Sequence, residues 1–405
     1  MRESESITRR GFLRGTSALA AAGWTAVGTS WVLKPDWAHA AGPIKMGIAT
    51  DITGAIAPSG NANWQAAQLA VKQINDAGGI LGQPVELFLE DTASDPGTAV
   101  GNVRRLVQSA EVDVILGGIT SAMREAIKNP IVRRGKTLYI YPQLYEGQEC
   151  TEHLYCTGPT PAQQCAKLLP YLIKEKGFKR FALPSANYIW PQLLNKWARR
   201  VIEENGAEVV MEEYFPLDQL EYSATVGKIM SEGVDHVFNT VIPPGLQAFM
   251  KQLYEAGYYD QGGQTCVYFD ENSVNYVAER ELEGVYSCLD MFSTVEDPFT
   301  QKLIADYNAM FPDTKYLFAA GAAATGMYRG VKLYEQAVIA TNGDLARDAT
   351  SAAIDSAEIA EGPGGPSKMI PGTGHADMNM YIAQSVGGKW DIISSEMAVP
   401  PQECA

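Results

Sequence analysis

The stretch VDVILGGITSAMREAIKNPIVRRGKTLYIY, residues 112–141, decides the fold class of this chain. It begins with an apolar run at 112–116, continues with a segment of helical periodicity at 122–134 and ends with a second apolar run at 137–141. Parallel strands need a crossover connection, and a helix between two buried strands is the usual one. The stretch therefore predicts a strand, a helix and a second, parallel strand, as in an α/β protein.

The same alternation of strand and helix extends over most of the chain. Before this stretch we expect strands at 44–49 and 85–90 and helices at 64–77 and 98–110. After it the pattern restarts, and further strands are expected at 180–184, 208–214, 236–241, 266–269, 285–289 and 380–385. The helices of this second part are expected at 162–176, 190–205, 223–232, 245–256, 298–310 and 319–341. The chain is therefore expected to hold two α/β units, each about as long as a doubly wound domain.

The first forty residues have the layout of an export signal. TRRGFLR (8–14) resembles the twin-arginine export motif, and a moderately apolar stretch follows at 15–33. Ala38-His39-Ala40 places small residues at the positions that a signal peptidase reads. We expect residues 1–40 to be a twin-arginine signal peptide, cleaved near Ala40, and the rest to reach the periplasm. A membrane anchor is the alternative, because the apolar stretch approaches the roughly 20 residues that a membrane span requires.

The charge balance excludes one class of partner. The chain has 32 Lys and Arg against 47 Asp and Glu, a formal net charge of -15. A protein that grips nucleic acid needs a basic face to neutralise phosphates, so we expect no nucleic-acid partner. Hydrophobic residues make up 46% of the chain, which excludes an intrinsically disordered protein.

The cysteines and histidines form no metal or haem motif. No CxxC or CxxCH occurs, and the six cysteines are Cys150, Cys156, Cys165, Cys266, Cys288 and Cys404. An oxidising compartment permits disulfides. Cys150 and Cys156 flank a short loop and can pair, whereas Cys266 and Cys288 lie on apolar runs that are candidates for neighbouring strands; the connectivity stays open. We expect structural cysteines, no metal and no cofactor.

The motifs of common enzyme classes are missing from the sequence. There is no GxSxG, no GxxxxGK[ST], no HExxH, and no GxGxxG after a strand. Neighbouring acidic pairs such as Glu203-Glu204 point apart on a helix and do not form an acid–base pair. We therefore expect a binding protein and not an enzyme.

Candidate binding residues follow the predicted strands, because ligands of open parallel sheets bind beyond the carboxyl ends of the strands. Thr120 and Ser121 open the helix after the strand at 112–116, where hydroxyls and a helix N-terminus suit an anionic or carbonyl oxygen. Their alternative role is helix capping. Aromatic and amide side chains follow the next strands and suit a pocket around a small polar ligand, with a place in the core as their alternative: they are Gln143, Tyr145, Tyr188 and Trp190.

Several segments together resemble a known family. They are AQLAVKQINDAGGILG (67–82), TSAMREAI (120–127), YPQLYEGQEC (141–150), NYIWP (187–191) and FNTVIPPG (238–245). In order and spacing they resemble type I periplasmic solute-binding proteins, the ABC-transporter receptors related to the leucine/isoleucine/valine-binding protein. Within that group the sequence is most similar to the urea and short-chain-amide branch.

The resemblance implies a fold of two Rossmann-like lobes joined by three hinge crossovers. The crossovers would lie near 157–161, 288–293 and 361–370. It implies an N-terminal lobe of residues 41–158 plus 291–362. The C-terminal lobe would hold residues 159–290 plus 363–405.

The resemblance also implies a ligand site and a function. Ser121, Tyr141 and Tyr188 would bind the ligand, with Thr120, Gln143, Tyr145 and Trp190 nearby. The protein would close over a small polar solute, such as urea, a short-chain amide or an aliphatic amino acid, and deliver it to an ABC permease in the inner membrane. An amino acid needs an anionic partner for its ammonium group, and the candidates are Glu146, Asp270 and Glu271.

Three positions depart from the urea-binding pattern, namely Ile119, Asn187 and Pro243-Pro244. Because the resemblance places them at the border of the cleft, they leave the identity of the ligand open. Two further functions also stay open. One is a ligand sensor for a regulatory partner, which would use the same lobes. The other is a redox enzyme, since twin-arginine export carries folded and often cofactor-loaded proteins.

Overall fold

The structure is a computed structural model, and it describes residues 42–321 and 323–404. The predicted signal peptide at 1–40 lies outside these residues. Among the described residues, no helix is both long enough and apolar enough to cross a membrane.

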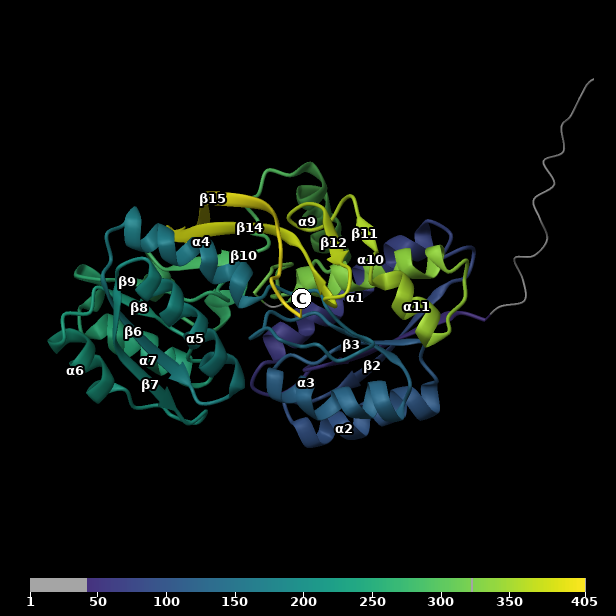
Figure 1. The fold of residues 1–405 in the computed structure, drawn as a ribbon, viewed down its shortest axis with the longest axis horizontal. Coiled ribbons are helices and arrows are strands. Elements are labelled where there is room, and N and C mark those ends of the chain that lie inside the picture. The colour runs from purple at the N-terminus through teal and green to yellow at the C-terminus, as the bar shows by residue number, and fades with distance from the viewer. Residues whose placement is uncertain (1–41, 322, 405) are drawn as a thin grey trace, which may run out of the picture. The chain divides into compact units, whose positions relative to one another are not determined.

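The strands of the described residues form two sheets (Figure 1). The first sheet has the order β11-β12-β13-β5-β4-β3-β1-β2. Its strands are β1 (Ile44–Thr50), β2 (Val85–Asp91), β3 (Val114–Gly117), β4 (Leu138–Tyr141), β5 (Leu154–Cys156), β11 (Glu358–Ile359), β12 (Ser367–Ile370) and β13 (His375–Ala376). The second sheet has the order β15-β14-β10-β9-β8-β6-β7. Its strands are β6 (Arg180–Ala186), β7 (Glu208–Phe215), β8 (His236–Phe238), β9 (Gly263–Thr265), β10 (Tyr286–Leu289), β14 (Met378–Val386) and β15 (Lys389–Val399).

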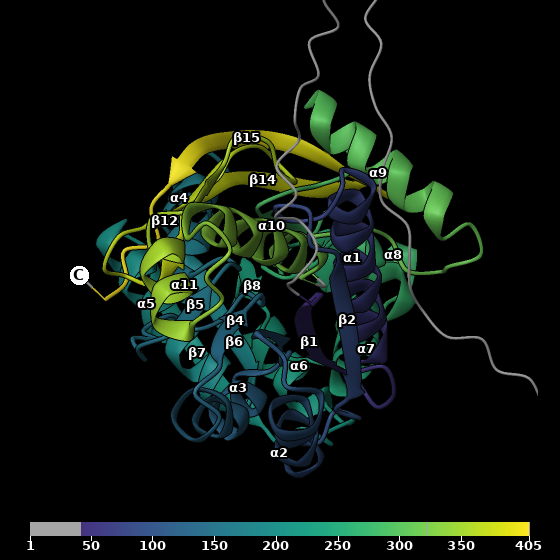
Figure 2. The same ribbon diagram turned by 90° about the vertical axis from the view of Figure 1, so that its right-hand side faces the viewer.

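Both sheets are parallel in the centre and antiparallel at one edge. Strands β1 to β5 pair in parallel, as do β6 to β10. The pairs β11–β12 and β12–β13 are antiparallel, and so are β10–β14 and β14–β15. The β14–β15 ribbon lies in the upper part of both views (Figures 1 and 2). The expected parallel α/β architecture is confirmed for the centre of each sheet.

Helices cover both faces of each sheet. The longer ones are α1 (Ala57–Asp76), α2 (Pro96–Arg105), α3 (Ser121–Lys128), α4 (Pro161–Lys174), α5 (Ile189–Glu204), α6 (Ser223–Ser231), α7 (Gly245–Glu255), α9 (Pro298–Met310), α10 (Ala324–Ala340) and α11 (Arg347–Ile354). Alternate residues of a strand point to opposite faces. Accordingly, Val114 and Leu116 of β3 join the core cluster that contains α1 and α10, whereas Ile115 joins the cluster that contains α2 and α3.

Local sequence signals explain where several helices begin. Asp297 accepts a hydrogen bond from the backbone N of Thr300 at 2.7 Å and caps α9, whose first residue is Pro298. Thr160 and Gln163 form a capping box at the start of α4, where Pro161 stands at the first position. A capping side chain satisfies a free backbone N–H, and proline at the first helical position has none to lose.

The chain passes between the sheets three times. The passages lie between β5 and β6, between β10 and β11, and between β13 and β14. The third passage was expected near 361–370, but β12 and β13 still pair in the first sheet, so the chain crosses at Asp377. The range 363–405, expected in the C-terminal lobe, is therefore shared by both sheets.

Some expected elements are displaced or were not foreseen. The strand expected at 266–269 is a turn, and the strand itself is β9 at Gly263–Thr265. Cys266, Val267 and Phe269 are fully buried, so this apolar run reflects burial beyond the strand end. Further elements were not expected from the sequence: the strand β5, the short strands β11, β12 and β13, the long strand β15 and helix α11. Helix α1 begins at Ala57 and not at residue 64.

The disulfide joins a pair that the sequence did not suggest. Cys150 bonds to Cys404, 254 residues away, whereas Cys156, Cys266 and Cys288 are free and buried. The pair Cys150–Cys156, which the sequence left as one option, does not form, and Cys266 and Cys288 are not bonded to each other although β9 and β10 are neighbours. The partner of Cys150 comes from the chain that follows β15, and only the tertiary fold brings that end of the chain back to the first sheet.

Candidate functional site

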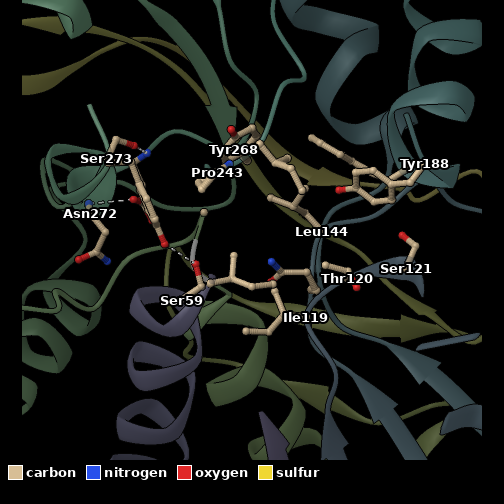
Figure 3. A pocket seen from close by; sticks show the side chains of 17 residues that line it. Ser59, Ile119, Thr120, Ser121, Leu144, Tyr188, Pro243, Tyr268, Asn272 and Ser273 are labelled. Atoms are coloured by element: carbon tan, nitrogen blue, oxygen red, sulfur yellow. Dashed lines mark hydrogen bonds between the residues drawn. The ribbon is translucent and has the colours of Figure 1, made fainter. Parts of the chain in front are cut away.

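One cavity lies where the carboxyl ends of strands from both sheets meet (Figure 3). Segments that follow β1, β3 and β4 border it from the first sheet, and segments that follow β6, β8 and β9 border it from the second. The cavity has a volume of about 80 Å³, counted as the space open to the centres of water molecules. One buried water needs roughly 10–15 Å³ by this measure, so the cavity holds several waters or one small ligand.

Five of the predicted binding residues line this cavity. They are Thr120, Ser121, Gln143, Tyr188 and Trp190. Figure 3 shows Ser121 and Tyr188 on one side of the cavity and Asn272 and Ser273 on the opposite side, with Leu144 between them. Ile119 and Pro243, two of the departures from the urea-binding pattern, also line the cavity, whereas Asn187 is exposed and bonds to Gln192.

Three predicted binding residues lie outside the cavity wall. Tyr141 is fully buried and donates its hydroxyl to the carbonyl of Ile119 at 3.0 Å, so it supports the wall from behind. Tyr145 is also fully buried, and its hydroxyl bonds to Nε2 of His375. Glu271 accepts a hydrogen bond from the backbone N of Ser293 at 2.5 Å and is not among the lining residues.

The first wall of the cavity is the turn between β3 and α3. Gly117 has φ of +132°, and a Cβ there would lie 2.0 Å from the carbonyl oxygen of Ala49, so only glycine fits. Thr120 caps α3 by accepting a hydrogen bond from the backbone N of Met123 at 3.1 Å. The first N–H groups of a helix have no intrahelical acceptor. The N-terminus of α3 therefore presents free donors and a partial positive charge next to Ser121.

A buried ionic cluster lies behind Ser121. The Ser121 hydroxyl donates to Oε2 of Glu146, and Oε1 of Glu146 accepts from Nη2 of Arg124 at 2.8 Å. Arg124 also donates from Nε to Glu149 at 2.9 Å, and its guanidinium lies over the rings of Tyr141 and Tyr145. Glu146 was a candidate partner for a ligand ammonium group, but it is bonded to Arg124 and does not line the cavity.

The second wall is aromatic. The rings of Trp190 and Tyr268 meet edge to face at 5.7 Å, and Tyr188 lies 6.2 Å from Trp190. Tyr268 donates its hydroxyl to the carbonyl of Val241 at 2.7 Å. Burial raises the pKa of Tyr188 well above its ordinary value, so its hydroxyl stays protonated and can donate. This wall is rigid and apolar apart from a few directed hydrogen-bonding groups.

Two polar atoms of the wall have no partner among the described residues. They are Oε1 of Gln143 and Nε1 of Trp190, and both side chains are buried. A buried polar atom without a hydrogen bond costs roughly 1–3 kcal/mol. Both atoms are enclosed within the wall, so the folded protein carries this cost there.

The far side of the cavity is formed by the turn after β9. Asp270 accepts a hydrogen bond from the backbone N of Asn272 at 2.8 Å, and Asn272 is held through both its amide atoms by Leu317 at 2.8 Å. Tyr276 bonds to Ser59 of α1 at 3.2 Å and so links the two sides of the cavity. No Lys, Arg or His is among the described residues that line the cavity.

Several lining residues were not expected from the sequence. Ser59 follows Pro58, a typical residue for the first turn of a helix, but the helix was expected to begin at 64. Tyr268, Asn272, Ser273 and Tyr276 follow β9, whose expected position was three residues too late. Tyr268 falls inside the strand expected at 266–269, so it was not considered as a residue beyond a strand end.

The site has the chemistry of binding and not of metal catalysis. Within the described ranges, no three His, Cys, Asp or Glu residues are grouped so that they could hold a metal ion. The lining combines aliphatic and aromatic side chains with hydroxyls, two amides and one carboxylate, Asp270. Such a mixture encloses a small molecule and directs a few hydrogen bonds to it.

Comparison with known proteins gives the same picture. The sequence profile of a family described as periplasmic binding protein matches residues 43–389. The leucine-, isoleucine-, valine-, threonine- and alanine-binding protein of Pseudomonas aeruginosa is 22% identical over 302 residues, which cover 73% of this chain and 80% of that protein. The Leu/Ile/Val-binding protein homolog 7 of Brucella suis is 26% identical over 233 residues, or 55% of this chain and 58% of that protein.

A solved structure shows the same fold. It is the solute-binding protein of an ABC transporter from R. palustris, in complex with benzoate, with a TM-score of 0.78 and 20% identity. The alignment covers 90% of this chain and 99% of that protein. At this level of identity the likeness establishes the two-lobed fold.

Proposed function

Because the chain belongs to the periplasmic binding protein family, we propose that it is the solute receptor of an ABC importer and that the cavity described above holds its ligand. One observation carries this proposal. Segments that follow the carboxyl ends of six strands, three from each sheet, converge on a single cavity lined by aromatic rings, hydroxyls and amides. Family membership also makes the chain a binding protein, so no redox chemistry is assigned to it.

The cavity suits a small solute that is partly polar and partly apolar. We propose a short-chain amide, urea or an aliphatic amino acid. The apolar part would contact Ile119, Leu144 and the rings of the aromatic wall. The carbonyl group of an amide or of urea would meet the N-terminus of α3, and the ammonium group of an amino acid would find Asp270, the one carboxylate of the lining.

Transport would follow from closure of the two lobes. We propose that the lobes move about the three passages between the sheets and trap the ligand between them, since hinge closure is the usual motion of such receptors. The closed form would then dock on an ABC permease and release the solute. The relatives from Pseudomonas aeruginosa and Brucella suis, named for binding amino acids, support the assignment to transport.

A thermal-shift panel tests the proposal. Purified protein is melted with urea, acetamide, propionamide, alanine, leucine and benzoate in turn. A ligand that binds the native state alone stabilises it by about 2.7 kcal/mol at a hundredfold excess over its Kd, so the true class raises the melting temperature. If no member of the panel shifts it, the proposed ligand classes are wrong.

Variants locate the site. Ser121→Ala and Tyr188→Ala should abolish most of the shift, because both side chains line the cavity. Tyr254→Ala is the matched control, since Tyr254 is an exposed tyrosine outside the lining. A shift that survives Tyr188→Ala but is lost in Tyr254→Ala would place the ligand elsewhere.

We also propose that the twin-arginine motif directs export. The support is the TRRGFLR segment followed by Ala38-His39-Ala40. Replacing Arg9 and Arg10 with lysine should leave the chain unprocessed in the cytoplasm, whereas the native sequence should yield a periplasmic form that begins near residue 41. Unchanged processing of the lysine variant would reject this route.

A further inference from the structure

We infer that Glu146 is a positioning residue that turns the hydroxyl proton of Ser121 away from the cavity, so that the site prefers an uncharged amide to the matching carboxylate. The inference rests on the proposed function, since it assumes that the ligand occupies this cavity. It goes further because it names a residue outside the cavity wall, Glu146, that decides whether Ser121 offers a ligand a hydrogen-bond donor or only acceptors.

The proton of Ser121 is fixed by a chain of buried contacts. Ser121, Glu146 and Arg124 are each 2–3% exposed. Arg124 cannot lose its proton in a protein, and it donates from Nη2 to Glu146 at 2.8 Å. The carboxylate of Glu146 that faces this guanidinium can only accept hydrogen bonds. The proton of the Ser121–Glu146 hydrogen bond must therefore come from Ser121.

The consequence is that Ser121 offers the cavity only lone pairs. A hydroxyl has a single proton and two acceptor positions. Since the proton is used on Glu146, a ligand atom at Oγ of Ser121 must be a donor.

A primary amide matches this arrangement and a carboxylate does not. The carbonyl oxygen of an amide can accept from the free N–H groups at the start of α3, while its NH₂ group donates to Ser121. A carboxylate of the same shape places a negative oxygen against the lone pairs of Ser121. The described lining residues include no Lys, Arg or His, so only the partial positive charge at the N-terminus of α3 offsets that repulsion.

Glu146→Gln tests the inference because it should reverse the direction of the hydrogen bond between Ser121 and residue 146, so that Ser121 accepts instead of donating. Arg124 can only donate, so it will hold the amide oxygen of the new glutamine, and the glutamine NH₂ group will face Ser121. That NH₂ group donates to Oγ, which frees the Ser121 proton to point into the cavity. Propionamide and propionate are the probes, because they have the same shape and differ in the group that meets Ser121.

The measured quantity is the ratio of the two dissociation constants, obtained by calorimetry. The wild-type protein should bind propionamide at least about tenfold more tightly than propionate, and Glu146→Gln should lower this preference by about tenfold. Glu149→Gln is the matched control: it also removes a carboxylate from Arg124, but Glu149 does not contact Ser121, so the preference should be unchanged. A merely structural role would lower both affinities together and leave their ratio unaltered.

The outcomes separate the inference from the proposed function. If the wild type binds neither probe nor any member of the earlier panel, the cavity is not the site and the proposed function fails. If it binds propionate as tightly as propionamide, or if Glu146→Gln keeps the wild-type ratio, the inference is wrong. Should Glu146→Gln fail to fold, Ser121→Ala decides: loss of the acceptor must weaken propionamide and spare propionate, and an unchanged ratio overturns the inference.

Discussion

Arg124 shows how one residue can organise the wall of a cavity without lining the cavity itself. Its side chain is buried, contacts Glu146 and Glu149 and lies over the rings of Tyr141 and Tyr145. A buried guanidinium costs much desolvation energy, which its partners offset only while both carboxylates are present. The cluster therefore holds α3 against the loop after β4, and both segments form the cavity wall.

Removing the arginine should destabilise the fold strongly. Arg124→Met should lower the free energy of unfolding by about 3–5 kcal/mol, because it leaves the buried carboxylate of Glu146 without its counter-charge, while Glu149 keeps only Lys128 at 3.0 Å. Arg105→Met is the control: Arg105 forms an ion pair with Glu90 on the surface and its loss should change little. Urea denaturation of the two variants measures the difference, and equal effects would contradict this account.

His236 gives the stability a defined pH dependence. It is fully buried against Phe178 and Phe181, and burial lowers its pKa from 6.5 to about 3. Below pH 6.5 the unfolded chain gains a proton that the folded chain does not, so stability falls with pH until about pH 3. One such group contributes a slope of about 1.4 kcal/mol per pH unit.

The His236→Gln variant should lose this slope. Free energies of unfolding are measured for both proteins between pH 4 and 6. As the pH decreases, the free energy of unfolding should fall more steeply in the wild type than in the variant. The difference in slope should be the contribution of one proton, about 1.4 kcal/mol per pH unit. The variant has a different absolute stability, but that does not affect the comparison of slopes. Parallel curves would show that His236 is not the group responsible.

At the scale of elements, close packing decides whether replacing a helix glycine with alanine raises or lowers the stability of the protein. Gly326 lies inside α10, and a Cβ there would come within 1.9 Å of the carbonyl oxygen of Pro142. Gly227 lies inside α6, where a Cβ meets nothing within 4 Å. Alanine normally stabilises a helix interior by about 1 kcal/mol relative to glycine. Gly227→Ala should therefore raise the melting temperature, while Gly326→Ala should lower it and displace α10 from the cavity loop. Equal shifts of the same sign would contradict the packing described for α10.

Elements with a strong local period could be predicted from the sequence, and others could not. The helices α4, α5 and α7 lie within two residues of their expected bounds, because apolar spacing and capping residues are local signals. The strands β11, β12 and β13 have two to four residues each, and their pairing depends on partners far away in the chain. No local pattern indicates such pairs.

The same limit applies to the site. Ser121, Tyr188 and Trp190 could be found because the residues after parallel strands share one edge of a sheet. The bonds from Glu146 to Ser121 and Arg124 could not be found, because they join residues 22 and 25 positions apart through a loop without regular structure. Tyr141 and Tyr145 were expected at the binding site, but neither lines the cavity, and Tyr141 supports its wall from behind.

At the scale of the whole molecule, the C-terminal residues tie the chain after β15 to the first sheet. Cys404 bonds to Cys150, Glu403 accepts from the backbone N of Gln148 at 2.6 Å, and Thr160 donates to the carbonyl of Pro401 at 2.9 Å. The disulfide closes a loop of 254 residues. Cross-links of this kind contribute about 2–5 kcal/mol, mainly by restricting the unfolded chain.

Removal of this disulfide should therefore lower stability. Cys150→Ser with Cys404→Ser should reduce the free energy of unfolding by about 2–5 kcal/mol. Reductant should lower the melting temperature of the wild type and leave the double variant unaffected. The control is Cys165→Ser, at a free buried cysteine, because its response to reductant should equal that of the wild type. A wild type that does not respond to reductant would argue against the Cys150–Cys404 bond.

The central claim is that the cavity between the carboxyl ends of the two sheets holds the solute, and calorimetry of ligand binding tests it most directly. The ligand that gives the largest thermal shift is titrated into the wild type, Tyr188→Ala and Tyr254→Ala. We predict one binding site per chain, an affinity reduced about tenfold or more in Tyr188→Ala, and the wild-type affinity in Tyr254→Ala. Equal affinities in the wild type and Tyr188→Ala would contradict the claim.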